Sequence, residues 1–168
     1  AWHAGRSFWA GETDINSRSI GIELDNRGDH PFSNKQMRAL IALCGDIAGR
    51  NNIPAHRVLG HSDVAIGRKT DPGARFDWRR LALSGVGVWP DLKTWHLNET
   101  VEMDPVMGKD APRLRAQFVK QAADYGYDPS LGLEQLLSSL RQHFAPHRSG
   151  PLSRFDFALL AALNALCN

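Results

Sequence analysis

The chain has 168 residues, and its 20 lysines and arginines against 18 aspartates and glutamates leave a formal net charge of +2. This length suffices for one domain with a sizeable core or for two small domains. Such a small net charge gives no support to a nucleic-acid groove or to a surface that binds anionic membranes. No apolar run approaches the ~18 to 20 residues that a membrane-spanning helix needs.

The N-terminal segment is first aromatic and then polar. Trp2 and Trp9 flank His3, which is compatible with an aromatic core whose histidine is satisfied locally. Residues 12–18 are polar and show no period, so they are predicted to form a loop.

Residues 19–25 alternate between two kinds of side chain. Ile20, Ile22 and Leu24 point one way, whereas Gly21 and Glu23 point the other way. A period of two predicts a strand packed on one face. Glu23 then lies on the opposite face, with room beside it at Gly21. From the pattern alone, this carboxylate is either an ordinary solvent-facing group or a functional one.

Residues 33–51 carry the clearest helical pattern. Ser33 and Gln36 can form a capping box at its start, and Asn52 and Pro54 follow its end. One apolar stripe runs along it at steps of three and four residues: Met37, Leu40, Ile41, Cys44, Ile47 and Ala48. We expect a packing helix, followed by a short strand at residues 58–59 that carries a histidine to its end.

Residues 60–73 hold the strongest chemical signal. His61 and Asp71 lie ten positions apart, and Lys69 would place a positive charge beside them. Imidazole and carboxylate are both zinc ligands, and a catalytic zinc site needs three protein ligands and an open water position. Glycine and proline bend the segment, so its side chains can converge. The alternative is a surface loop with scattered charges.

Other histidines and the cysteines are predicted to bind no metal. His56 is five positions before His61, which is the wrong parity for one face of a strand. His143 and His147 are four apart, but Pro146 lies between them, so both are predicted to be surface residues. The two cysteines, Cys44 and Cys167, are far in sequence from the candidate ligands, which argues against a cysteine-containing metal site.

After a short helical run at residues 79–83, the chain changes character. Residues 92–109 have no period and contain Pro105 and Gly108, which is typical of a linker. Three amphipathic stripes follow, and short helices of this kind can bury their stripes only on each other. We therefore predict three parts: a domain of residues 1–91, a linker of residues 92–109, and a small three-helix domain of residues 110–168.

Four motifs stand in a characteristic order in the first half of the chain: Trp2-His3-Ala4-Gly5, Ser19-Ile20-Gly21-Ile22-Glu23-Leu24, Gly60-His61-Ser62-Asp63 and Arg68-Lys69-Thr70-Asp71-Pro72-Gly73. Together they resemble the zinc-dependent N-acetylmuramoyl-L-alanine amidases of the type-2 amidase family, which are similar in fold to the peptidoglycan recognition proteins. The resemblance implies an α/β fold, with a mixed central sheet and flanking helices, and Zn²⁺ as the cofactor.

The resemblance also implies a role for each matching residue. His61 and Asp71 would be zinc ligands. Members of the family take another zinc-binding histidine from a strand upstream of the first motif, so we expect an upstream or separate segment to supply it, and two ligands alone should hold zinc weakly. Glu23 would accept a proton from the attacking water, and Lys69 would stabilise the developing oxyanion. Substrate-binding roles are implied for the following residues: Trp2, His3, Asn16 and Arg68.

The C-terminal helices are similar to a three-helix peptidoglycan-binding module, through Gly126-Tyr127 and residues 142–148. The alternative is a packing appendage without a ligand. We expect an enzyme that hydrolyses the amide bond between N-acetylmuramic acid and L-alanine in peptidoglycan or muropeptides, in the cell envelope (the periplasm or at the outer membrane). The other hypothesis is a non-catalytic peptidoglycan-binding protein, or an inactive fragment without the first zinc ligand. A pure binder would have no physical reason to keep Glu23, His61, Lys69 and Asp71 together.

Overall fold

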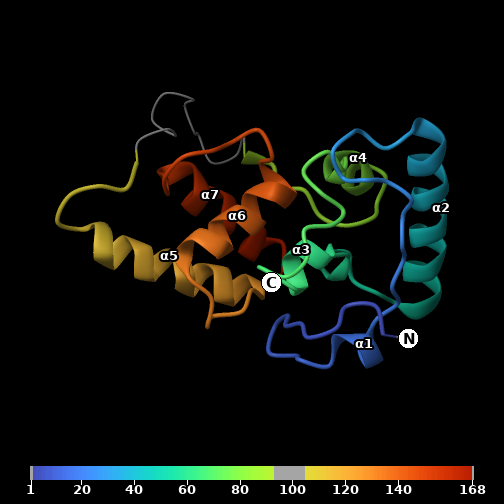
Figure 1. Cartoon of the computed structure of the whole chain (residues 1–168), viewed down its shortest axis with the longest axis horizontal. Coiled ribbons are helices and arrows are strands. Elements are labelled where there is room, and N and C mark those ends of the chain that lie inside the picture. Colours follow the sequence, from blue (N-terminus) through green and yellow to red (C-terminus); the bar gives the residue numbers. More distant parts are fainter. Residues whose placement is uncertain (1, 93–104, 168) are drawn as a thin grey trace.

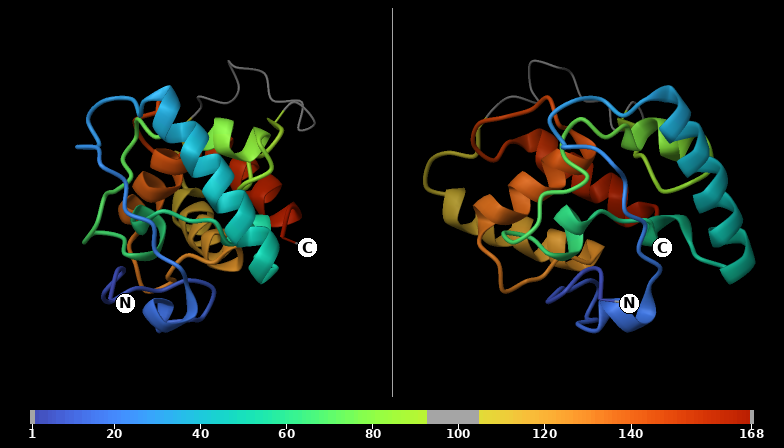
Figure 2. Two further views of the ribbon diagram at one scale, coloured as in Figure 1. Left: turned by 90° about the vertical axis from the view of Figure 1, so that its right-hand side faces the viewer. Right: turned by 45° about the vertical axis from the view of Figure 1, so that its right-hand side comes forward.

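The computed structural model describes residues 2–92 and 105–167, and helices dominate this part of the chain (Figure 1). Their order is α1 (Ile15–Arg18), α2 (Asn34–Asn51), the 3₁₀ helix η1 (Ala55–Arg57), α3 (His61–Val64), α4 (Trp78–Leu83), α5 (Ala111–Tyr125), α6 (Leu133–Phe144) and α7 (Arg154–Ala165). In Figure 1 and in the right-hand view of Figure 2, α2 lies on one side of the molecule and α5–α7 on the other, and in the left-hand view of Figure 2 α2 faces the viewer. The short helix α3 lies between these two groups (Figure 1).

The α/β class with a mixed central sheet is wrong for the described residues, because they contain no β-strand. Pairing is limited there to two isolated bridges, Trp9 with Glu12 and Pro105 with Ser153. Strands were predicted at residues 19–25 and 58–59, but residues 20–27 and 58–60 run without regular structure. Alternating side chains define the two faces of an extended chain, but a sheet also needs a second segment whose backbone groups bond to the first. No described segment provides one.

The helix α2 follows its sequence pattern closely. Ser33 is the N-cap, and its hydroxyl accepts a hydrogen bond from the Gln36 backbone N–H at 3.2 Å. The Gln36 side chain does not close the capping box; it donates to the Asp25 carbonyl oxygen at 3.1 Å instead. This bond connects the start of α2 to residues 20–27, which we call the extended segment. The apolar stripe of α2 helps to form a small core cluster, whose buried residues are Met37, Leu40, Phe76, Trp78, Leu81 and Val86.

The three C-terminal stripes form the helices α5, α6 and α7, as predicted. These three helices do not form a separate core of their own, because residues of the N-terminal segment and of α3 belong to the same buried cluster. Trp9 packs edge-on against Tyr125 and Tyr127, with ring centroids 5.4 and 5.0 Å apart, and Val64 lies in the same cluster.

The division into two domains stays a prediction, and most of the predicted linker, residues 93–104, lies outside the described residues. Across the part that is described, no helix has both the length and the apolar character needed to cross a membrane.

Candidate active site

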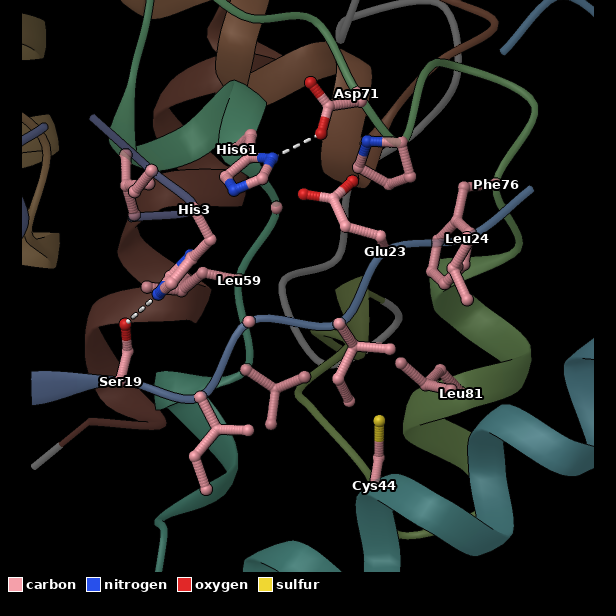
Figure 3. Close-up of a pocket in the computed structure, with 18 of the residues that line it drawn as sticks. His3, Ser19, Glu23, Leu24, Cys44, Leu59, His61, Asp71, Phe76 and Leu81 are labelled. Carbon is pink, nitrogen blue, oxygen red and sulfur yellow. Dashed lines mark hydrogen bonds and ion pairs between the residues drawn. The ribbon is translucent and has the colours of Figure 1, made fainter. Parts of the chain in front are cut away.

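A cavity of about 1100 Å³ lies between the extended segment, α2 and the loop that begins at His61. Its lining is apolar towards α2, where Leu40, Cys44 and Leu81 contribute. It is polar at the other end, where His61, Asp71 and Glu23 gather (Figure 3). The candidate chemistry is therefore placed at the polar end of a partly apolar hollow.

The loop from His61 to Asp71 is closed by its own backbone. The Ser62 N–H donates to the Asp71 carbonyl oxygen at 2.9 Å, so the two ends of the loop meet. Between them, α3 ends in a turn in which the Ala65 N–H bonds the His61 carbonyl oxygen at 2.8 Å. Gly67 has a φ of +75°, a conformation that favours glycine. The nine residues between His61 and Asp71 thus form one compact loop.

This closure brings the two predicted metal ligands into contact. His61 Nδ1 and Asp71 Oδ2 are hydrogen-bonded, and the His61 side chain is largely buried whereas that of Asp71 is half exposed. The Lys69 ammonium lies 3.3 Å from His61 Nδ1 and donates to the His3 carbonyl oxygen at 2.8 Å. The positive charge predicted beside the pair is therefore present.

Glu23 approaches the same point from the extended segment. Its side chain is exposed, and in Figure 3 the carboxylate points towards the His61–Asp71 pair. The residue lines the cavity with them. Glu23, from a distant segment, thus joins the imidazole and carboxylate of the loop at one end of the cavity, and the Lys69 ammonium lies beside that imidazole.

His3 forms the next wall of the site. Its ring stacks on His61, with centroids 5.9 Å apart, and its Nε2 lies 3.0 Å from the Ser19 hydroxyl. Burial, and then the charge of neighbouring His61, lowers the pKa of His3, so its neutral form is favoured at pH 7. The space predicted beside Gly21 is filled by this ring, because a Cβ atom at position 21 would lie 2.5 Å from His3 Cγ.

The other three predicted substrate-binding residues do not line the cavity. Trp2 is 90% exposed. Asn16 Oδ1 accepts from the backbone N–H groups of residues 3, 4 and 5 at 3.0, 2.9 and 3.3 Å. The Arg68 guanidinium donates to the carbonyl oxygens of Ala4 and Arg6. Asn16 and Arg68 therefore fix the N-terminal segment, and their role towards a substrate stays a prediction.

Sequence reasoning missed a buried group directly behind this site. Asp63 is only 1% exposed and accepts from the Gly60 N–H at 2.8 Å and from the Tyr127 hydroxyl at 3.2 Å. Burial, and then the Asp63 carboxylate, raises the pKa of Tyr127 well above its ordinary value, so this phenol remains a donor. The third partner of Asp63 is His143 Nδ1, at 2.8 Å.

The surface position predicted for His143 is wrong, since its side chain is 3% exposed. Its spacing contained the signal: position 143 falls three residues after Leu140 and seven after Leu136, on the inner stripe of α6. Trp78 stacks on its ring at 3.8 Å between centroids. His147, by contrast, is exposed as predicted.

The residues present fit a zinc site in part. His61 and Asp71 have suitable donor chemistry and meet at one point, at the polar end of the cavity. Within residues 2–92 and 105–167, however, no group of three histidine, cysteine, aspartate or glutamate side chains is placed to hold a metal ion. The described residues therefore offer two candidate ligands of the three that a catalytic zinc site requires.

A histidine and a carboxylate paired in an open cavity, with a second carboxylate and an ammonium beside them, define a hydrolase-type site. The sequence profile of the N-acetylmuramoyl-L-alanine amidases (type 2) matches residues 1–74. The curated amidase AmiD of Escherichia coli K12 is 37% identical over 162 residues, which cover 87% of this chain and 56% of AmiD. The amidase AmpD of Enterobacter cloacae is 45% identical over 81 residues, 48% of this chain and 43% of AmpD.

Two solved structures extend the likeness to the fold. The complex of AmiD from E. coli with anhydro-N-acetylmuramic acid-L-Ala-D-gamma-Glu-L-Lys superposes with a TM-score of 0.85 at 37% identity, covering 97% of this chain and 67% of that one. AmpDh3 from Pseudomonas aeruginosa, in complex with an anhydromuramic pentapeptide, gives a TM-score of 0.76 at 34% identity, covering 98% and 69%. The chain belongs to the N-acetylmuramoyl-L-alanine amidase family. It spans about half the length of the curated relatives it matches.

Proposed function

We propose that this protein hydrolyses the amide bond between N-acetylmuramic acid and L-alanine, with anhydromuropeptides as its substrates. The observation that carries the proposal is the His61–Asp71 pair with Glu23 facing it, at the polar end of a cavity. The ligands named in the AmiD and AmpDh3 complexes support the choice of substrate, because each contains an anhydromuramic group linked to a peptide.

We further propose that His61 and Asp71 hold a zinc ion, with a third ligand from outside the described residues. A zinc ion bound there would polarise the scissile carbonyl and lower the pKa of water at the site. His61 is suited to this role because its ring is fixed between His3, Lys69 and Asp71.

The remaining steps fall to the side chains around the pair. Glu23 accepts a proton from the water that attacks the carbonyl carbon, and passes it to the alanine nitrogen as the carbon–nitrogen bond breaks. The oxygen of the attacked carbonyl gains negative charge, which the Lys69 ammonium stabilises from beside His61. The products are a free muramic carboxylate and a peptide with a free amino terminus.

The direct experiment is to incubate an anhydromuramyl peptide and zinc with the purified chain, with and without the upstream segment expected to supply the third ligand, and to separate the products by chromatography and mass spectrometry. Because two ligands hold zinc weakly, we expect little cleavage by the chain alone and zinc-dependent cleavage, stopped by a chelator, once the upstream segment is present. His61→Ala and Asp71→Ala should abolish it.

Full-length AmiD from E. coli is the positive control. No cleavage with the segment present, at any zinc concentration and with AmiD active, would contradict the proposal. Strong cleavage by the chain alone would show that another group completes the site, His3 being the first to test.

The second candidate is a non-catalytic protein that binds peptidoglycan, and the specific observation in its favour is the absence of a third ligand among residues 2–92 and 105–167. Calorimetric binding of the same muropeptide without any cleavage would select it. Since peptidoglycan lies in the cell envelope, we propose that either function is exercised there, which fractionation of cells would test.

A further inference from the structure

Three side chains on one face of α6 reach the loop that carries the candidate ligands. Gln142 and His143 lie three and four residues after Ser139, so all three side chains project from the same side of the helix. Each makes one hydrogen bond of 2.8 Å to the loop. The partners are Ser62, Thr70 and Asp63 respectively.

These partners are the chain neighbours of both candidate ligands. The Ser139 hydroxyl donates to the carbonyl oxygen of Ser62, the residue after His61. The Gln142 amide donates to the carbonyl oxygen of Thr70, the residue before Asp71. The helix α6 therefore holds the loop by hydrogen bonds next to His61 and next to Asp71.

The third contact is a buried hydrogen bond between an imidazole and a carboxyl group. Asp63 and His143 are both almost fully buried, and a buried carboxylate is stable only where several donors surround it. The imidazole is one of three such donors, beside the Gly60 N–H and the Tyr127 hydroxyl. Removing it would leave the carboxylate short of a partner at a point two residues from His61. The present conformation of the loop would then be less stable relative to alternative conformations.

We propose that His143 is a positioning residue, and that α6 holds His61 and Asp71 in register through its bonds to Asp63, Ser62 and Thr70. In this arrangement the C-terminal helices support the active-site loop directly. The catalytic meaning of this support rests on the proposed amidase function, but the positioning itself is a property of the fold. Groups that hydrogen-bond metal ligands directly contribute about 10- to 100-fold to metal affinity or activity. Because α6 bonds the chain neighbours of His61 and Asp71, we expect an effect at the lower end of that range.

Two substitutions of His143 separate its hydrogen bond from its packing. His143→Asn keeps a donor in the place of Nδ1 but loses the ring that stacks on Trp78, 3.8 Å away between centroids. His143→Phe keeps a ring and loses the donor. Gln142→Ala removes a half-buried contact and covers the case in which the phenylalanine variant does not fold. Ser138→Ala, on the exposed side of α6, is the matched control for Ser139→Ala.

The measurements are amide hydrogen exchange of residues 61–71, with the amides of α2 as an internal reference, and zinc affinity by competition with a chromophoric chelator. We expect His143→Phe, Gln142→Ala and Ser139→Ala to speed exchange in the loop but not in α2. His143→Phe should also weaken zinc binding by about tenfold. His143→Asn and Ser138→Ala should resemble the wild type.

The inference is overturned if His143→Asn and His143→Phe behave alike, or if Gln142→Ala and Ser139→Ala leave loop exchange unchanged. Failure of the amidase proposal has a different signature. In that case no muropeptide is cleaved even with the upstream segment present, while the exchange experiment on the chain still gives its answer.

Discussion

Gly21 lies directly against the side chain of His3. A Cβ atom at position 21 would lie within 2.5 to 2.9 Å of three atoms of that side chain, a spacing that forces one of them to move. We therefore expect Gly21→Ala to displace His3 from its stack on His61 and to lower kcat/KM for muropeptide cleavage. Steady-state kinetics would measure the loss.

A second glycine provides the control for this substitution. Gly49 lies inside α2, where an added Cβ atom would meet nothing within 4 Å. Alanine is favoured over glycine in a helix interior by about 0.5 to 1 kcal/mol. Gly49→Ala should therefore stabilise the protein slightly in urea and leave activity unchanged. Equal losses of activity in both variants would contradict the role given to the Gly21 contact.

Glu23 allows a sharp test of the proton-transfer step. Glu23→Gln keeps the shape of the side chain but cannot accept a proton, so we expect cleavage to fall by roughly 10² to 10⁴. Zinc affinity should stay close to that of the wild type, because Glu23 is not a proposed ligand. Asp25→Asn, two positions along the same exposed segment and outside the cavity lining, is the matched control. A fully active Glu23→Gln variant would remove Glu23 from the mechanism.

At the scale of single elements, the cap of α2 gives a prediction about stability alone. Ser33 satisfies one free N–H at the start of the helix through its bond to Gln36. Replacing such a cap by alanine typically costs about 1 kcal/mol. Ser33→Ala should lower the free energy of unfolding by this amount in urea, whereas Lys35→Ala, in the exposed first turn, should change it little. An unchanged midpoint in Ser33→Ala would show that Gln36 finds another partner.

The same elements show what the sequence could predict. The 3.6-residue period of α2 and of the C-terminal helices is satisfied within each segment, so their existence and their inner faces follow from local pattern. The placing of His61 beside Asp71 followed for a similar reason, since glycine and proline close a short loop. Both features depend on residues close together in the chain.

The strand predictions were wrong because a β-strand needs a second strand to pair with, and a local sequence pattern does not specify that second strand. Residues 19–25 alternate as a strand would and still form no ladder in the described chain. The Asp63–His143 pair was missed for a related reason: it joins residues 80 positions apart. His143 lies on the apolar stripe of α6, but a histidine at such a position indicates a buried side chain strongly only when its buried hydrogen-bond partner is known.

At the scale of the whole molecule, the principal core joins the N-terminal segment, α3 and the C-terminal helices. One buried ion pair holds the last two helices of this core together. Arg141 donates to both carboxylate oxygens of Asp156 at 2.8 and 2.7 Å, and the Ser153 N–H and hydroxyl donate to Oδ2 at 2.8 Å. Asp156 is fully buried. The contact between α6 and α7 therefore includes one buried charge whose hydrogen-bonding partners are all present.

Asp156→Asn would leave the Arg141 guanidinium without its counter-charge in a buried place. Breaking a buried pair in this way typically costs about 3 to 5 kcal/mol, so we expect a loss of that size in urea unfolding. Asp46→Asn, which breaks the exposed pair with Arg50 on α2, should cost less than about 1 kcal/mol. Because the core is shared, amides of the His61 loop should lose protection together with those of α7 in Asp156→Asn. Loss of protection confined to α5–α7 would instead show that these helices unfold independently, as a separate domain would.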